Sequence, residues 1–102
     1  NNPAAPAGAV HFSDVIYVFN NLRMKDYPWT DLDHKTADTL ATYWTNFAKA
    51  ANPNGEGLVN WPAYNPQDEY WLNVGDSVRM ERFNSRGVDV IAALQEEIRR
   101  AR

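Results

Sequence analysis

One helical pattern limits what this chain of 102 residues can fold into more than any other feature. Thr30 and Asp33 form a short-armed version of the capping box, a motif typical of helix starts. Apolar residues then recur every three or four positions, which is the period of a helix with one apolar side. They are Ala37, Leu40, Ala41, Trp44, Phe47, Ala48 and Ala51. Asn52 and Pro53 end the pattern, so the sequence predicts a long helix over residues 30–52.

Shorter elements lie on both sides of this helix. Residues 15–19 form an apolar run whose β-branched and aromatic side chains favour a strand. Ser13 and Asp14, which come just before the run, are good helix caps, so a short helix and a buried extended segment both remain open. After the long helix, apolar and polar residues alternate on each side of a Gly-Asp turn at residues 75–76. This alternation predicts a hairpin over residues 68–83.

A second helical pattern follows the hairpin. Asn84 or Ser85 would cap this helix, which we expect over residues 86–101. Its apolar side is formed by Val88, Ile91, Leu94 and Ile98. The order of elements is therefore a loop, a short apolar element, a long helix, a hairpin and a helix. Such a set has little core, so we expect an α/β arrangement that is not a complete domain alone.

Composition excludes several classes of function. The net charge of −3 and the isoelectric point near 5.2 argue against a nucleic-acid partner. No apolar run is long enough to predict a membrane span. The chain has no cysteine, and its two histidines are too far apart in sequence to suggest a metal site, so we expect no metal or cofactor. The compartment stays open between cytoplasmic and secreted.

His11 is the main candidate for chemistry. It follows a stretch rich in Pro, Ala and Gly and directly precedes the apolar run, so we expect it in a loop over residues 1–13. A histidine on a turn suits proton transfer, although on the local pattern alone a structural role outweighs a chemical one. Ser13 is a poor nucleophile because no strand–turn–helix elbow surrounds it. Asp14 could either cap the next element or tune His11, and His34 fits a solvated helix surface.

Three stretches of this sequence resemble the C-terminal end of type B carboxylesterases, the α/β-hydrolase family that includes cholinesterases and para-nitrobenzyl esterases. Residues 8–19, GAVHFSDVIYVF, are similar to the family's Gly-x-x-His-x-x-Glu/Asp-Ile-x-Tyr/Phe-x-Phe segment. Residues 43–55, YWTNFAKAANPNG, are similar to its Trp-x-Asn-Phe-Ala-x-x-Gly-x-Pro-Asn segment. Residues 61–64, WPAY, follow at the family's usual distance. The likeness extends over residues 7–74 and, more weakly, to the end of the chain.

The resemblance implies that the chain is the C-terminal part of an α/β-hydrolase fold and that His11 is the histidine of a Ser–Glu/Asp–His triad. The partners in such enzymes occur in the chain order Ser, acid, His. The nucleophile, the acid and the oxyanion hole would then lie on upstream sequence, either in the same protein or on a larger N-terminal polypeptide left by a nick. Phe12, Ser13 and Asp14 would either line the substrate pocket or support the histidine without touching the substrate. The substrate implied is a small carboxylic ester, and the chain alone would be inactive.

Three departures from the family pattern stand out. Phe12 occupies a position where many relatives have glycine, and its ring could reshape the substrate pocket. Ala51 replaces the glycine before Asn-Pro, so we expect the long helix to end later or without a left-handed cap. The C-terminal cysteine of cholinesterases is absent, which favours a bacterial source.

Two other functions remain open beside ester hydrolysis. The chain could be a non-catalytic helix–hairpin module that docks through its aromatic side chains. It could also belong to a catalytically dead, esterase-like adhesion domain.

Overall fold

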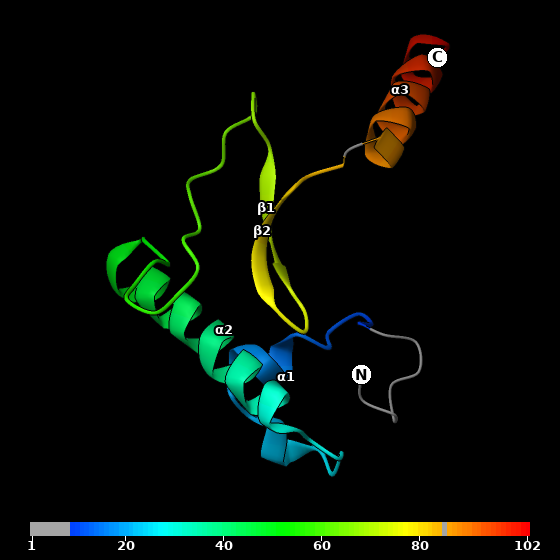
Figure 1. Cartoon of the computed structure of the whole chain (residues 1–102). Coiled ribbons are helices and arrows are strands. Elements are labelled where there is room, and N and C mark those ends of the chain that lie inside the picture. Colours follow the sequence, from blue (N-terminus) through cyan, green and yellow to red (C-terminus); the bar gives the residue numbers. More distant parts are fainter. Residues whose placement is uncertain (1–8, 85) are drawn as a thin grey trace.

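The computed structural model describes residues 9–84 and 86–102, and the elements follow one another as Figure 1 shows. They are α1 (Val15–Val18), the short 3-10 helix η1 (Leu22–Met24), α2 (Asp31–Ala50), β1 (Tyr70–Val74), β2 (Val78–Arg82) and α3 (Arg86–Arg100). Residues 1–8 of the expected histidine loop lie outside the described residues, as does Ser85, one of the two caps considered for the last helix. The other candidate, Asn84, accepts a hydrogen bond from the Arg86 amide through its side chain (3.2 Å).

The apolar run after His11 forms a helix and not a strand. Hydrogen bonds from the Tyr17 and Val18 amides to the Asp14 carbonyl, at 3.0 and 2.9 Å, start the single turn of α1. A second short turn, η1, follows, and its Leu22 is almost fully buried. Strand propensity is a weak preference, and packing against a neighbouring helix overrides it here.

The long helix α2 begins with the capping box expected at Thr30 and Asp33, and both of its reciprocal hydrogen bonds are present. It ends at Ala50, because Ala51 adopts a left-handed conformation with φ of 52°. The expectation that the helix would end later or without a left-handed cap was therefore wrong. Ala51 takes the conformation that glycine adopts most easily, and its amide donates to the Phe47 carbonyl at 2.7 Å.

The buried interior of the chain lies between α2, α1 and the coil after α2. Among the described residues, four apolar side chains are buried: Leu22, Ala37, Leu40 and Tyr43. The Tyr43 hydroxyl donates to the Val59 carbonyl at 2.6 Å, and this bond holds the coil against the helix. Asn54 holds the same coil because its side chain bonds both the amide and the carbonyl of Trp61, at 2.5 and 2.8 Å.

The hairpin forms with the alternation that the sequence predicts. Leu72 pairs with Met80 and Val74 with Val78, so apolar residues meet on one side of the antiparallel pair. After the hairpin the chain runs away from the other helices, and α3 lies apart from α1 and α2 (Figure 1). The apolar residues of its stripe are each more than half exposed: Val88, Ile91, Leu94 and Ile98.

The dimensions of the chain are those of an incomplete domain. Its Cα radius of gyration is 17.3 Å, whereas a compact domain of this length has a radius of gyration of about 13 Å. Large aromatic side chains also stay exposed outside α3, including Phe19, Phe47 and Trp71 at 70%, 59% and 50%. The two helical regions and the hairpin are therefore consistent with part of a larger α/β domain.

Candidate functional site

His11 lies on a turn that leads directly into α1. The Ser13 amide donates to the Val10 carbonyl at 3.0 Å, and the Val15 amide donates to the Phe12 carbonyl at 3.3 Å. The turn is therefore continuous with the helix, and a shift of α1 would carry the turn with it. The His11 side chain is exposed at the surface of this segment.

Phe12 has an uncommon backbone conformation. Its φ is 66°, in the left-handed region, which costs a residue with a Cβ atom roughly 1–2 kcal/mol relative to the right-handed one. This geometry gives a physical reason for glycine at the matching position of many relatives. The Phe12 ring meets the His11 ring edge-on, with 4.3 Å between centroids, and is 70% exposed. Phe12 thus lies against the candidate base on an open face.

Ser13 and Asp14 complete the turn, and among the described residues neither side chain is hydrogen-bonded to the His11 ring. Ser13 is half-buried, and Asp14 is the N-cap residue of α1, although its carboxylate makes no capping hydrogen bond. Within residues 9–84 and 86–102, no carboxylate is hydrogen-bonded to His11. The turn therefore presents a histidine and an aromatic ring, and the described residues supply no acid partner for the imidazole.

A pair of side chains that the sequence interpretation missed joins α1 to α2. The Tyr17 hydroxyl donates to Asp33 Oδ1 at 2.8 Å, across 16 positions of sequence. Asp33 Oδ2 accepts from both the amide and the hydroxyl of Thr30, each at 2.8 Å. A second side-chain hydrogen bond also reaches α2, from Asn20 Nδ2 to Asp38 Oδ1 at 2.8 Å. The capping box signalled Asp33, but nothing in the sequence marked Tyr17 as its partner.

The Tyr17–Asp33 contact also changes how both groups titrate. Burial, assisted by the hydrogen bond to the Asp33 carboxylate and its charge, raises the pKa of Tyr17 from 10.0 to about 12. Burial alone would raise the pKa of Asp33, but the hydrogen bonds from Thr30 and Tyr17 outweigh it and lower that pKa. At neutral pH Tyr17 is therefore neutral and Asp33 is ionised. A hydrogen bond to an ionised acceptor is stronger than one between two neutral groups.

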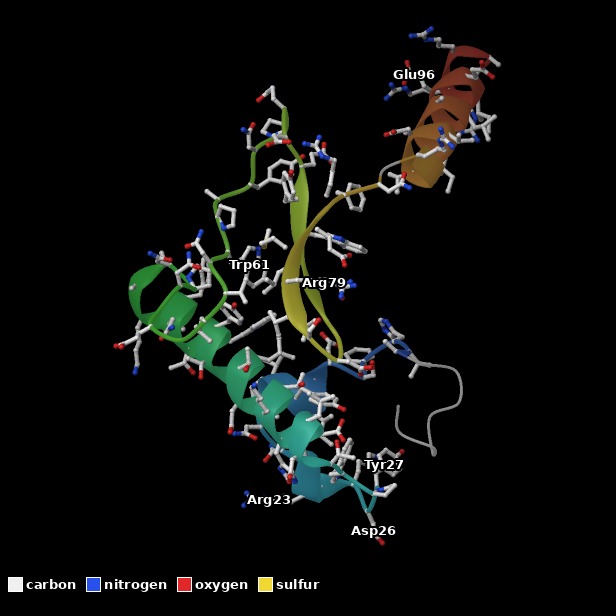
Figure 2. The ribbon with its side chains drawn as sticks, viewed as in Figure 1. Arg23, Asp26, Tyr27, Trp61, Arg79 and Glu96 are labelled. Carbon is white, nitrogen blue, oxygen red and sulfur yellow. The ribbon has the colours of Figure 1, made fainter. Side chains whose placement is uncertain are left out.

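The aromatic residues of α2 face the coil that follows it and not the His11 turn. A groove of about 730 Å³ lies between the second half of α2 and residues 51–63, with Trp44 and Phe47 in its lining. Trp61 crosses from the coil toward the helix (Figure 2), and its ring centroid is 5.6 Å from that of Tyr43 and 6.4 Å from that of Trp44. These contacts support packing as the role of Trp61.

Among the described residues, no three or more His, Asp or Glu side chains are grouped in a way that could hold a metal ion. No helix in that same part of the chain is long and apolar enough to cross a membrane. His34, the other histidine, is exposed in the first turn of α2.

Comparison with known proteins identifies the family of this chain. The model of the carboxylesterase family matches residues 1–90, and the chain belongs to this family. Membership implies the α/β-hydrolase fold, of which three helices and a two-stranded sheet would form one part.

Individual relatives are carboxylesterases and related hydrolases of animals. The chain is 36% identical over 77 residues to the medium-chain fatty acyl-CoA hydrolase precursor of Anas platyrhynchos, covering 69% of this chain and 14% of the relative. It is 31% identical over 84 residues to liver carboxylesterase 1F of Rattus norvegicus, covering 80% of this chain and 15% of the relative. It therefore spans about a seventh of the length of these relatives. Their sources do not test the expectation of a bacterial source, which stays a prediction.

Proposed function

We propose that this chain is the C-terminal segment of an enzyme that hydrolyses carboxylic esters with a Ser–Glu/Asp–His triad, and that His11 is its general base. The observation that carries the proposal is the position of His11. It lies at the histidine of the family's motif, on a turn fixed to α1, with its side chain exposed. Membership of the carboxylesterase family supports the reaction class.

His11 would perform four proton transfers in this reaction. One ring nitrogen takes the proton of the serine nucleophile as it attacks the ester carbonyl and then gives it to the departing alcohol. The same nitrogen later takes a proton from the water that attacks the acyl-enzyme, and it returns this proton to the serine oxygen as the acyl–serine bond breaks. The other nitrogen donates to the triad acid, which fixes the orientation of the ring. The serine, the acid and the oxyanion hole lie on upstream sequence in this proposal.

Phe12 would line the substrate pocket beside this histidine. Its ring already lies against His11 and is 70% exposed, so a bound ester near the imidazole would meet it. Ser13 and Asp14 would support the turn from behind and are not triad members. The names of the relatives suggest acyl esters as the substrate class, and we expect a short-chain aryl ester to serve as an assay substrate.

The alternative of an independent docking module has weaker support. A module of this kind would need a core of its own, and the described residues bury four apolar side chains. Domains of this size are marginal even when compact. An esterase-like domain without a nucleophile would share every feature of this segment, and only the upstream sequence separates it from an enzyme.

The two histidines offer a matched test in the whole enzyme. We expect His11→Ala to lower kcat by about 10⁴- to 10⁶-fold, since a triad that loses its base keeps only binding and oxyanion stabilisation. His34→Ala should leave kcat unchanged, because His34 is exposed in the first turn of α2. Hydrolysis of a short-chain aryl ester measures both, and a fluorophosphonate probe should label a serine upstream of this segment. Full activity of His11→Ala would overturn the assignment.

A further inference from the structure

The His11 turn is attached to a helix that cannot hold its own position. α1 has four residues, and a single helical turn is unstable without tertiary contacts because nucleation of a helix is unfavourable. Its place must therefore come from contacts with the rest of the protein. Since the turn over residues 11–14 is continuous with α1, the contacts that fix α1 also restrain the backbone position of His11.

One of these contacts involves the phenol of Tyr17. Its hydroxyl donates to Asp33 Oδ1 at 2.8 Å in a half-buried position. The Trp29 ring packs edge-on against the Tyr17 ring, with 5.9 Å between centroids, and the Trp29 indole N–H is held by the Lys25 carbonyl at 3.0 Å. The Tyr17 side chain is therefore restrained both at its hydroxyl and along its ring.

Asp33 provides a fixed anchor for that hydroxyl. Its Oδ2 is used by the Thr30 amide and hydroxyl, so the carboxylate is locked in the first turn of α2. Helix α2 has 20 residues and is the longest element of the chain. A continuous path of hydrogen bonds and backbone thus runs from α2 through Asp33 and Tyr17 to α1 and the His11 turn.

From this path we propose that Tyr17 and Asp33 are positioning residues for ester hydrolysis, because their hydrogen bond sets the location of His11 relative to the nucleophile. The inference rests on the proposed function. Displacement of a catalytic group by about 1 Å can cost as much as a hundredfold in rate. Loss of the Tyr17 hydroxyl should therefore slow the reaction in correctly folded enzyme, beyond any effect on stability.

A pair of Tyr→Phe variants in the whole enzyme tests this inference. Tyr17→Phe removes the hydroxyl that bonds Asp33, whereas Tyr43→Phe removes a similar bond to the Val59 carbonyl in the interior away from His11. Activity is normalised to the number of serines labelled by a fluorophosphonate at completion. We expect Tyr17→Phe to lower kcat about tenfold or more with little change in KM. Tyr43→Phe should lower the melting temperature and leave kcat per labelled serine unchanged.

A double-mutant cycle shows whether Tyr17 acts through Asp33. If it does, Tyr17→Phe will cost little further kcat in a background that already carries Asp33→Ala. Additive losses in the cycle, or a Tyr17→Phe enzyme with normal kcat per labelled serine, would overturn the positioning role. His11→Ala is measured in parallel. If its activity is lost while Tyr17→Phe remains normal, the inference fails alone, whereas an active His11→Ala enzyme defeats the proposed function as well.

Discussion

The helical half of this segment and its C-terminal half differ in how much of their structure they hold by themselves. The region from α1 to the coil after α2 surrounds the four buried apolar side chains and has the hydrogen bonds that link one element to another. The region from β1 to α3 has a paired hairpin and a helix whose apolar stripe is exposed. The candidate base belongs to the first region. We propose that this region positions His11 through the contacts of α1 with α2.

The largest expected effect is the loss of cooperative folding when the segment is separated from the remaining protein. We expect isolated residues 1–102 to lack a sharp thermal transition, because four buried side chains provide too little apolar burial to offset the conformational entropy of the chain. Circular dichroism during heating would show a broad, shallow loss of helix signal. A sharp cooperative transition would break the comparison, since both regions would then belong to one self-sufficient module.

Within the isolated segment we expect a smaller effect, a difference in amide exchange rate between α2 and α3. Backbone amides in α2 should exchange with solvent more slowly than those in α3, by about tenfold or more, because α2 contacts α1 and the coil while α3 lies apart. Hydrogen exchange followed by mass spectrometry of peptides from the two helices measures this ratio. Equal exchange rates would mean that the buried residues of α2 give it no more protection than α3 has.

The sequence predicted the parts of the fold that depend on local patterns. The capping box, the apolar stripe and the alternation around the Gly75 turn are each properties of neighbouring residues, and α2 and the hairpin follow from them. Two features could not be predicted from such local patterns. The Tyr17–Asp33 contact joins residues 16 positions apart, and Phe12 and Ala51 adopt left-handed conformations that their side chains disfavour.

The candidate site was predictable only through the family resemblance. The local pattern around His11 favoured a structural role, and the described residues supply no carboxylate hydrogen-bonded to its ring. Its assignment as the base therefore stays a prediction until variants are measured. The structure contributes the support of the turn, namely the continuity with α1 and the link from α1 to α2.

The smallest expected effect is a change in stability when one of two carboxylates, one in each region, is replaced. Asp33 bonds Thr30 and Tyr17, whereas Glu96 pairs with Arg99 and Arg100 on the exposed surface of α3 (Figure 2 labels Glu96). Surface ion pairs contribute little, so Glu96→Gln should change the unfolding free energy of the whole enzyme by about 0.5 kcal/mol or less. Asp33→Asn should destabilise more, because an amide at this position cannot accept from both the Thr30 amide and its hydroxyl while also serving Tyr17.

The pH dependence of this difference gives the sharpest test. The folded pKa of Asp33 is lowered from 3.8, so its stabilisation is complete above that value and is lost as the pH falls through the folded pKa. The gap in melting temperature between the wild-type enzyme and Asp33→Asn should therefore be constant near neutral pH and shrink below about pH 4. Glu96→Gln measured over the same range is the control for general acid effects. A gap that stays constant into acid would mean that the ionised Asp33 carboxylate does not stabilise the contact with Tyr17 and Thr30.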